Sequence, residues 1–268
     1  MSPAENAKLI ILGPSNAIAV NPKYFEKVSP AVYNFAQGGA TPSYNKTWYR
    51  ELFKKHYPKP EIILYSADWF MFYGNQNERF RKLEYDSEYF PADFFMAALL
   101  DNDFSNKDLL LNRFPILKYR DGFADMVFGQ SLKSDFLMDR FYKGGVPFRQ
   151  KDYAASDVPV SKKNDEQVRS FEEMLDLFRA DGIQVILFFM PEYLPELSGN
   201  IDYAKKAGIV RAIAKNRKLP LLDYNDEKKS EINSNVILFN DFSHLNSSGS
   251  EKFSEMLAND VVKLMKAE

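Results

Sequence analysis

Short apolar runs alternate with amphipathic helical patterns along most of this chain, and this alternation limits its fold more than any other feature. Runs with the length and composition of buried strands occur at residues 7–13, 32–36, 61–65, 183–189 and 219–222. Helical patterns occur at residues 48–55, 167–179 and 203–217 and from Ser250 onward. Because strands that alternate with helices form right-handed crossovers, we predict a three-layer α/β/α sandwich of about five parallel strands in flavodoxin-like order. Ser248 and Glu251 have the spacing of a capping box for the last helix.

The stretch from about residue 74 to residue 164 interrupts this alternation. It is rich in Phe, Tyr, Asp, Lys and Arg, contains no clean strand, and shows moderate helical patterns only at residues 94–100 and 131–141. No repeat, low-complexity tract or flexible linker sets it apart. We therefore interpret residues 1–268 as a single domain that carries an insertion packed over the sheet.

Composition excludes several classes of function. The net charge is −2 and the basic residues are dispersed, so nucleic acid is not an expected partner. The chain has no cysteine and only 2 histidines, which excludes disulfides and thiolate metal sites and argues against zinc. We expect no metal and no cofactor. Apolar residues make up 45% of the chain, enough for a large core.

No segment of the sequence approaches the ~20 apolar residues that a membrane helix needs. The longest apolar run extends only from Val185 to Pro191. The first predicted strand follows closely after Met1, which is compatible with a signal or anchor removed upstream.

Polar residues follow the predicted strands at the points where the strands end. Ligands of open α/β sheets bind at this edge, outside the carboxyl ends of the strands. The residues expected there are Ser15, Gly38, Gly39, Ser66, Asp68, Asp241 and His244. The sequence therefore predicts a polar site on one rim of the sheet.

Three of these residues have the chemistry of a Ser-His-Asp triad. Asp241 precedes His244 by three residues, so its carboxylate can fix the imidazole tautomer and leave the other ring nitrogen free to accept a proton. His56 follows a basic helix end and is expected on the surface, which leaves His244 as the base for Ser15. Two alternatives remain: Ser15 caps a helix, or His244 is a core or turn histidine.

The same strings resemble the SGNH/GDSL-type hydrolases over about two-thirds of the chain. Gly13-Pro14-Ser15 is similar to the nucleophile motif of that family, and the string at residues 34–41 to its glycine block, with Gly39 at the glycine position. Asp241 and His244 are similar to its Asp-x-x-His block. The resemblance implies an acyl-serine mechanism in which the N–H groups of Ser15 and Gly39 hold the oxyanion.

One block departs from the family. Ala67 stands where the family has an asparagine that donates to the oxyanion, so that donor is absent or is replaced by Ser66 or a backbone N–H. Loss of one such donor costs about a hundred- to a thousandfold in turnover, which predicts slow hydrolysis. Asp68 has two interpretations: it contacts substrate at the rim, or it bonds neighbouring backbone N–H groups. Gly39, Ser66 and Asp68 are the candidate oxyanion and substrate-binding residues.

The Asp68-Trp69-Phe70 string and the turn at residues 191–193 resemble a divergent branch of the superfamily. This branch includes the D-alanyl-transfer proteins of teichoic-acid modification and the alginate-acetylation proteins. The resemblance implies an acyl ester or carbohydrate substrate, a membrane-bound acyltransferase as partner and a place in the cell envelope, with the cytoplasm as the alternative. We predict acyl transfer on envelope glycans; a free-standing esterase and a non-catalytic glycan-binding protein are the alternatives.

Overall fold

The computed structural model describes residues 7–73, 152–154, 162–200, 203–225 and 230–267. Nearly all of the expected insertion, including the helical patterns at residues 94–100 and 131–141, lies outside the described residues. In the part of the chain that is described, no helix is long and apolar enough to cross a membrane.

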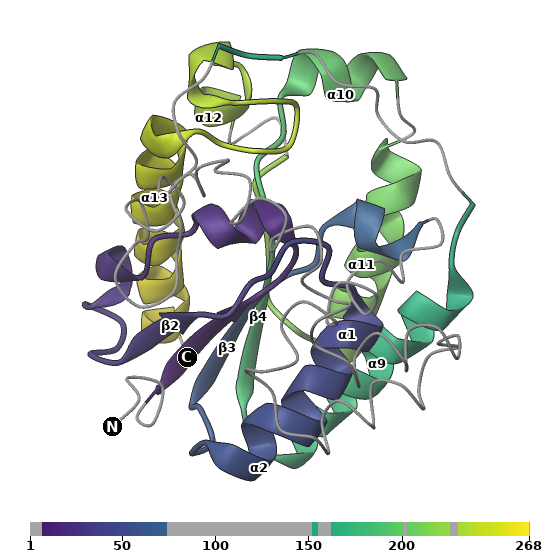
Figure 1. Ribbon diagram of the computed structural model, residues 1–268, viewed down its shortest axis with the longest axis vertical. Coiled ribbons are helices and arrows are strands. Elements are labelled where there is room, and N and C mark those ends of the chain that lie inside the picture. The colour runs from purple at the N-terminus through teal and green to yellow at the C-terminus, as the bar shows by residue number, and fades with distance from the viewer. Residues whose placement is uncertain (1–6, 74–151, 155–161, 201–202, 226–229, 268) are drawn as a thin grey trace, which may run out of the picture.

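A five-stranded parallel sheet forms the centre of the molecule, as predicted (Figure 1). Its strands are β1 (Leu9–Leu12), β2 (Val32–Asn34), β3 (Ile62–Ser66), β4 (Gln184–Phe189) and β5 (Leu221–Asp223). They lie in the order β2-β1-β3-β4-β5, which is the flavodoxin-like order. The three strands β1, β2 and β3 are fully buried, because helices cover both faces of a parallel sheet.

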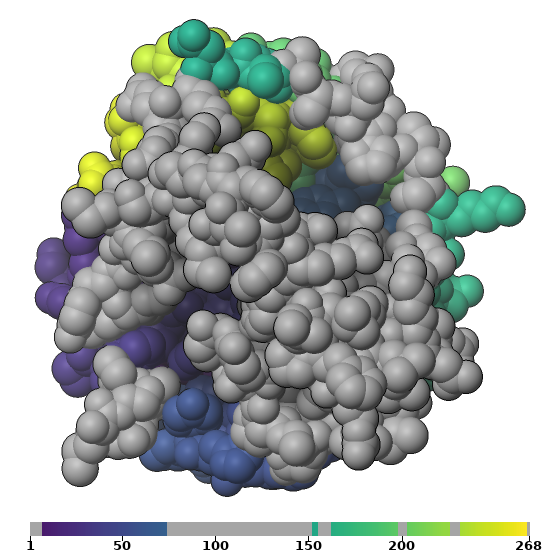
Figure 2. All heavy atoms as spheres, in the orientation of Figure 1, coloured from purple at the N-terminus to yellow at the C-terminus, as the bar shows by residue number. Residues whose placement is uncertain are grey.

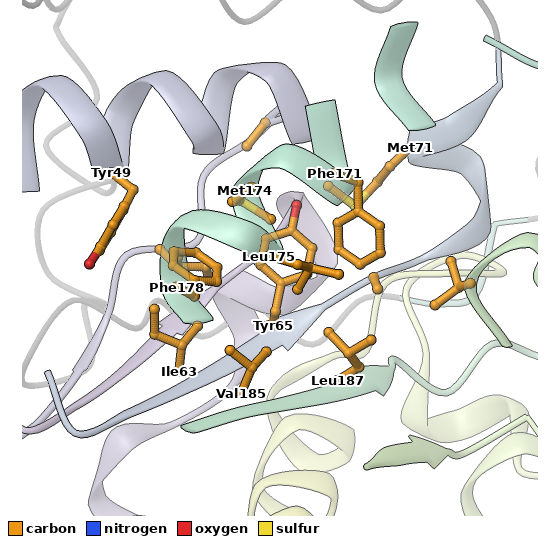
Figure 3. Close-up of a cluster of buried hydrophobic side chains, with 14 of the residues drawn as sticks. Tyr49, Ile63, Tyr65, Met71, Phe171, Met174, Leu175, Phe178, Val185 and Leu187 are labelled. Carbon is orange, nitrogen blue, oxygen red and sulfur yellow. The ribbon is translucent and has the colours of Figure 1, made fainter. Parts of the chain in front are cut away.

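Helices that lie between β2 and β5 in the chain cover one face of the sheet (Figure 1). They are α1 (Pro42–Thr47), which continues through a π-helix (Trp48–Phe53) into α2 (Lys54–His56), together with α9 (Asp165–Ala180) and α11 (Tyr203–Arg217). Figure 3 shows alternate residues of β3 and β4, among them Ile63, Tyr65, Val185 and Leu187, in the core on this face beside Phe171 of α9.

The last helix, α13 (Ser247–Ala267), covers the opposite face. The intervening residues of the same strands, such as Leu64 and Ile186, pack against its Phe253 and Leu257. Two cores on opposite faces establish the three-layer α/β/α sandwich. The shorter helices are η2 (Ser15–Ala19), η3 (Pro22–Phe25), η5 (Trp69–Phe72), α10 (Leu194–Asn200), α12 (Ser230–Asn233) and η9 (Val236–Leu238).

The start of α13 differs from the prediction. The helix begins at Ser247 rather than Ser250, and the Asn246 side chain accepts a hydrogen bond from the Gly249 N–H at 3.1 Å. The predicted Ser248–Glu251 capping box is therefore wrong, since Asn246 caps the helix.

Candidate active site

Ser15 begins η2, directly after the turn that follows β1, and we call residues 13–19, which comprise this turn and η2, the serine turn. Gly13 has a φ of +154°, and a Cβ added there would lie 2.6 Å from the Ser66 Cβ, so glycine is required. Pro14 is the N-cap residue of η2 and Ser15 is the first residue of that helix, with its Oγ 2.9 Å from the His244 Nε2. The capping alternative therefore does not hold, and the hydroxyl is directed elsewhere.

His244 lies in the loop that precedes α13, which we call the histidine loop (residues 239–245). A bridge between Phe239 and Leu245 closes the loop, and the Asn240 N–H donates to the His244 carbonyl at 2.7 Å. Inside it, the Asp241 carboxylate accepts from the His244 N–H at 2.8 Å. These bonds fix the loop backbone on which both side chains stand.

The two loops bring Ser15, His244 and Asp241 together although Ser15 and His244 are 229 residues apart in sequence. The Ser15 Oγ is 2.9 Å from the His244 Nε2, and the His244 Nδ1 is 2.9 Å from the Asp241 Oδ2. Since a carboxylate only accepts, the Nδ1–H donates to Asp241 and leaves Nε2 as the acceptor for the serine hydroxyl. This is the arrangement in which an imidazole can remove the serine proton.

Asp241 is held in its charged form. Burial alone would raise the pKa of its carboxyl, but hydrogen bonds from His244 and from the backbone hold that pKa below its ordinary value. The side chains of His244 and Asp241 are 27% and 31% exposed, so the pair borders solvent rather than lying in the core. A charged acceptor beside Nδ1 favours the protonated imidazole that forms as the serine attacks.

Gly39 lies in the loop after β2, which contacts the serine turn through the Gln37 N–H, a donor to the Gly13 carbonyl at 3.1 Å. Gly39 is exposed and has a φ of +70°, a conformation that favours glycine. Within the described residues, no acceptor bonds the backbone N–H of Ser15 or of Gly39. Both groups are therefore available to a ligand.

Ser66 ends β3 and Ala67 and Asp68 follow it, and all three are completely buried. The Ser66 hydroxyl donates to the Asp68 carboxylate, and the Met190 N–H donates to its other oxygen at 2.9 Å. Bonding to a backbone N–H is one of the two interpretations of Asp68 from sequence. The Ala67 N–H donates to the Phe188 carbonyl at 2.9 Å, so neither the Ser66 hydroxyl nor the Ala67 N–H is free to replace the missing asparagine.

Several polar residues around the site were not singled out from the sequence. Asn34 ends β2 and donates to the carbonyls of Ala17 and Val20, which holds η2 against the sheet. Glu192 is completely buried and accepts from the Trp69 indole N–H at 3.0 Å. Asn34 is the last residue of β2 and Glu192 lies shortly after β4, but a sequence does not show which residues at the end of a strand turn inward.

His56 is exposed at the end of α2, as expected. The described residues contain no group of three or more acidic or histidine side chains that could hold a metal ion. Figure 2 shows a hollow on one face of the molecule, between the yellow C-terminal part of the chain and the blue residues close to β3.

No protein-family model matches the chain, and no curated protein matches its sequence. Several solved structures are similar to it. An acetylxylan esterase from Geobacillus stearothermophilus is 11% identical, with 96% of this chain and 94% of the esterase covered and a TM-score of 0.48. A GDSL-like lipase from Bacteroides thetaiotaomicron is 13% identical, with 96% and 88% covered and a TM-score of 0.46. A psychrotrophic esterase from Pseudoalteromonas sp. is 11% identical, with 97% and 99% covered and a TM-score of 0.43. Likenesses this distant carry no function to the chain, whose activity must be argued from its own site.

Proposed function

We propose that this protein is a serine-dependent acyl-transfer enzyme of SGNH/GDSL hydrolase type that acts on O-acyl esters of carbohydrates or cell-envelope polymers. The observation that carries the proposal is the hydrogen-bonded series from the Ser15 hydroxyl through His244 to Asp241. A serine hydroxyl is a poor nucleophile until a base removes its proton, and the His244 Nε2, 2.9 Å from the Ser15 Oγ, is in position to do so.

The first half of the reaction forms an acyl-serine. The Ser15 Oγ attacks the ester carbonyl while its proton passes to the His244 Nε2, and Asp241 stabilises the imidazolium. The oxyanion of the tetrahedral intermediate accepts from the backbone N–H groups of Ser15 and Gly39. The intermediate then collapses as His244 returns the proton to the departing alkoxide, which leaves the acyl group on Ser15.

The second half transfers the acyl group to an acceptor hydroxyl. Water gives hydrolysis and a carbohydrate hydroxyl gives transfer. In both cases His244 removes the proton of the attacking group and returns it to the Ser15 Oγ as the bond between Ser15 and the acyl carbon breaks. The absence of the third oxyanion donor at Ala67 favours a slow enzyme, as is suitable for modification of a polymer beside a membrane-bound acyltransferase in the cell envelope.

A fluorophosphonate probe tests the nucleophile, because it reacts covalently only with an activated serine. We expect one adduct per wild-type chain by intact mass, and none on Ser15→Ala or His244→Ala. His56→Ala is the matched control, since it removes the other histidine of the chain, exposed at the end of α2, and should label like the wild type. A folded wild-type protein without an adduct would refute the triad and favour the glycan-binding alternative.

The acceptor is tested separately with a small acetyl ester as donor. Addition of an oligosaccharide should yield acetylated sugar by mass spectrometry at the expense of free acetate. Free acetate alone, released rapidly and unaffected by the sugar, would contradict transfer and indicate the free-standing esterase.

A further inference from the structure

Asp68 is a completely buried acid that the acyl-transfer steps do not use. Burial of a carboxylate is costly unless hydrogen bonds satisfy it. Each of its two oxygens accepts one hydrogen bond, from the Ser66 hydroxyl on one side and from the Met190 N–H on the other. Burial nevertheless raises the pKa of Asp68 to about 6, since these bonds only partly offset it. The donors of these two bonds, Ser66 and Met190, connect Asp68 to the two loops that carry the triad.

On one side Asp68 contacts the serine turn. Gly13 packs so closely on Ser66 that the position its Cβ would occupy is 2.6 Å from the Ser66 Cβ. Asn16, the neighbour of Ser15, is completely buried, and its amide helps to hold down the pKa of Asp68 without a direct hydrogen bond of good geometry. The position of Ser15 is therefore coupled to Ser66 and Asp68 by direct packing.

On the other side Asp68 holds the segment after β4. The Met190 carbonyl accepts from the Asn225 amide at 2.9 Å, and the Glu192 N–H donates to the Asn225 Oδ1 at 2.8 Å. Asn233 adds a bond from its amide to the Glu192 carbonyl at 2.9 Å. Residues 190–192 are thus fixed by side chains that follow β3 and β5.

The segment after β4 in turn holds the histidine loop. The Tyr193 N–H donates to the carbonyl of Phe242 at 2.7 Å, and Phe242 lies between Asp241 and His244 in the chain. The Tyr193 ring packs against Phe239 at the start of the same loop, with ring centroids 5.9 Å apart. A continuous series of contacts therefore runs from the serine turn through Asp68 to the histidine loop.

We propose that Asp68 is a positioning residue that holds the serine turn and the histidine loop in register, so that the Ser15 hydroxyl meets the His244 ring. The inference rests on the proposed function, because it assigns Asp68 a role in aligning that triad. Asp68 has no contact with substrate in this account and acts only through Ser66 and Met190. A misplacement of about 1 Å in a reacting group can cost a hundredfold in rate.

The test is the fluorophosphonate reaction of Asp68→Ala and Asp68→Asn, at a temperature where circular dichroism shows each variant folded. Asp68→Ala removes both acceptors, so we expect its maximal labelling rate to fall about tenfold or more with little change in the probe concentration at half-maximal rate. Asp68→Asn should recover the rate to within about threefold, because its amide oxygen accepts from Met190 and its amide nitrogen donates to Ser66.

Asn45→Ala is the matched control for loss of a buried hydrogen bond. The Asn45 amide donates to the Tyr65 hydroxyl at 3.0 Å in the core on the α9 side of the sheet. This variant should lose stability and keep its labelling rate. Labelling of folded Asp68→Ala at the wild-type rate, or an equal loss in Asp68→Asn, would overturn the inference. If Asp68→Ala does not fold, Asn225→Ala takes its place, because it releases residues 190–192. We expect the same tenfold fall in its labelling rate. Labelling at the wild-type rate would again refute the positioning role of Asp68.

Ring signals in the NMR spectrum separate this inference from the proposed function. The chain has only two histidines, and exposed His56 serves as an internal reference. In Asp68→Ala the ring signals of His244 should shift while those of His56 stay fixed. A wild type that forms no adduct refutes the proposed function, whereas unchanged His244 signals in the folded variant refute the positioning role.

Discussion

Replacement of Asp68 by asparagine should change how the stability of the protein depends on pH. Burial raises the pKa of Asp68 from its ordinary value of 3.8 to about 6, so the folded chain binds this proton more tightly than the unfolded chain. The resulting stabilisation is complete below pH 3.8 and is lost as the pH rises through 6. Asparagine cannot ionise and does not show this loss. The stability of Asp68→Asn relative to the wild type should therefore increase as the pH rises.

The magnitude follows from the difference between the two pKa values. About two pH units at about 1.4 kcal/mol per unit give a relative gain of about 3 kcal/mol between pH 4 and pH 7. For a chain of this length that gain corresponds to roughly 6–12 °C in the difference between the melting temperatures. Urea titrations of both proteins at pH 4, 5, 6 and 7 measure it directly. The reasoning would be refuted if the difference between the free energies of unfolding of the two proteins stayed constant within about 0.5 kcal/mol across this range.

Asp181→Asn is a control with the opposite sign. Burial alone would raise the pKa of Asp181, but hydrogen bonds from Lys54 and Tyr49 hold it below its ordinary value. Its contribution to stability is present at neutral pH and is lost as the pH falls through the folded-state pKa. The stability of this variant relative to the wild type should therefore decrease as the pH rises. If the relative stabilities of both variants changed with pH in the same direction, a general effect of charge removal would be indicated instead of an effect of burial.

Three further changes have definite outcomes. Asp241→Asn should lower kcat for a small acetyl ester by about 10⁴-fold, because the imidazole loses its charged partner; an unchanged kcat would exclude the orienting role. Gly13→Ala places a Cβ against Ser66 and should cost about 1–3 kcal/mol in a urea titration, and a variant as stable as the wild type would show that the serine turn is not tightly packed. Asn246→Ala removes the acceptor for the Gly249 N–H and should lower the free energy of unfolding by about 1–2 kcal/mol in a urea titration. The fluorophosphonate reaction checks that the site of this variant is intact. An unchanged free energy of unfolding would contradict the capping role of Asn246.

The fold could be predicted from sequence because each strand is marked by a run of apolar residues without alternation, which is the pattern of strands buried on both faces. The predicted strand ends differ from the observed ones by no more than two residues, and β5 is only half-buried along its length. The helix predicted at residues 48–55 begins earlier, at Pro42, because Thr41 caps it by accepting from the Tyr44 N–H. That Thr-Pro pair is a helix-start signal.

The start of α13 was mispredicted for a reason that lies in packing. Gly249 contacts the Leu238 carbonyl so closely that a Cβ would lie 2.2 Å from its oxygen. A glycine near a helix start is weak helix signal in sequence, yet here it lets the first turn lie against η9. The contact that favours the earlier start is between α13 and η9, so no local sequence pattern predicts it.

The candidate site divides in the same way. Ser15, His244 and Asp241 were named from sequence because only one histidine remained as a base, and the structure places them in hydrogen-bond contact. Their catalytic roles remain predictions. Asp68 kept two interpretations, since a polar residue after a strand can turn toward the rim or inward. The choice depends on Met190, which lies 122 residues away in sequence.

The missing oxyanion donor bears on both halves of the proposed reaction. Acylation and deacylation pass through tetrahedral intermediates on the same Ser15, and both oxyanions depend on the N–H groups of Ser15 and Gly39. The Ser66 hydroxyl is bonded to Asp68 and the Ala67 N–H is bonded to Phe188, so neither of these two groups replaces the missing donor. The loss therefore raises both barriers and cannot by itself favour a sugar over water. In the proposed reaction, the choice between transfer and hydrolysis must depend on how well an acceptor hydroxyl is held beside His244.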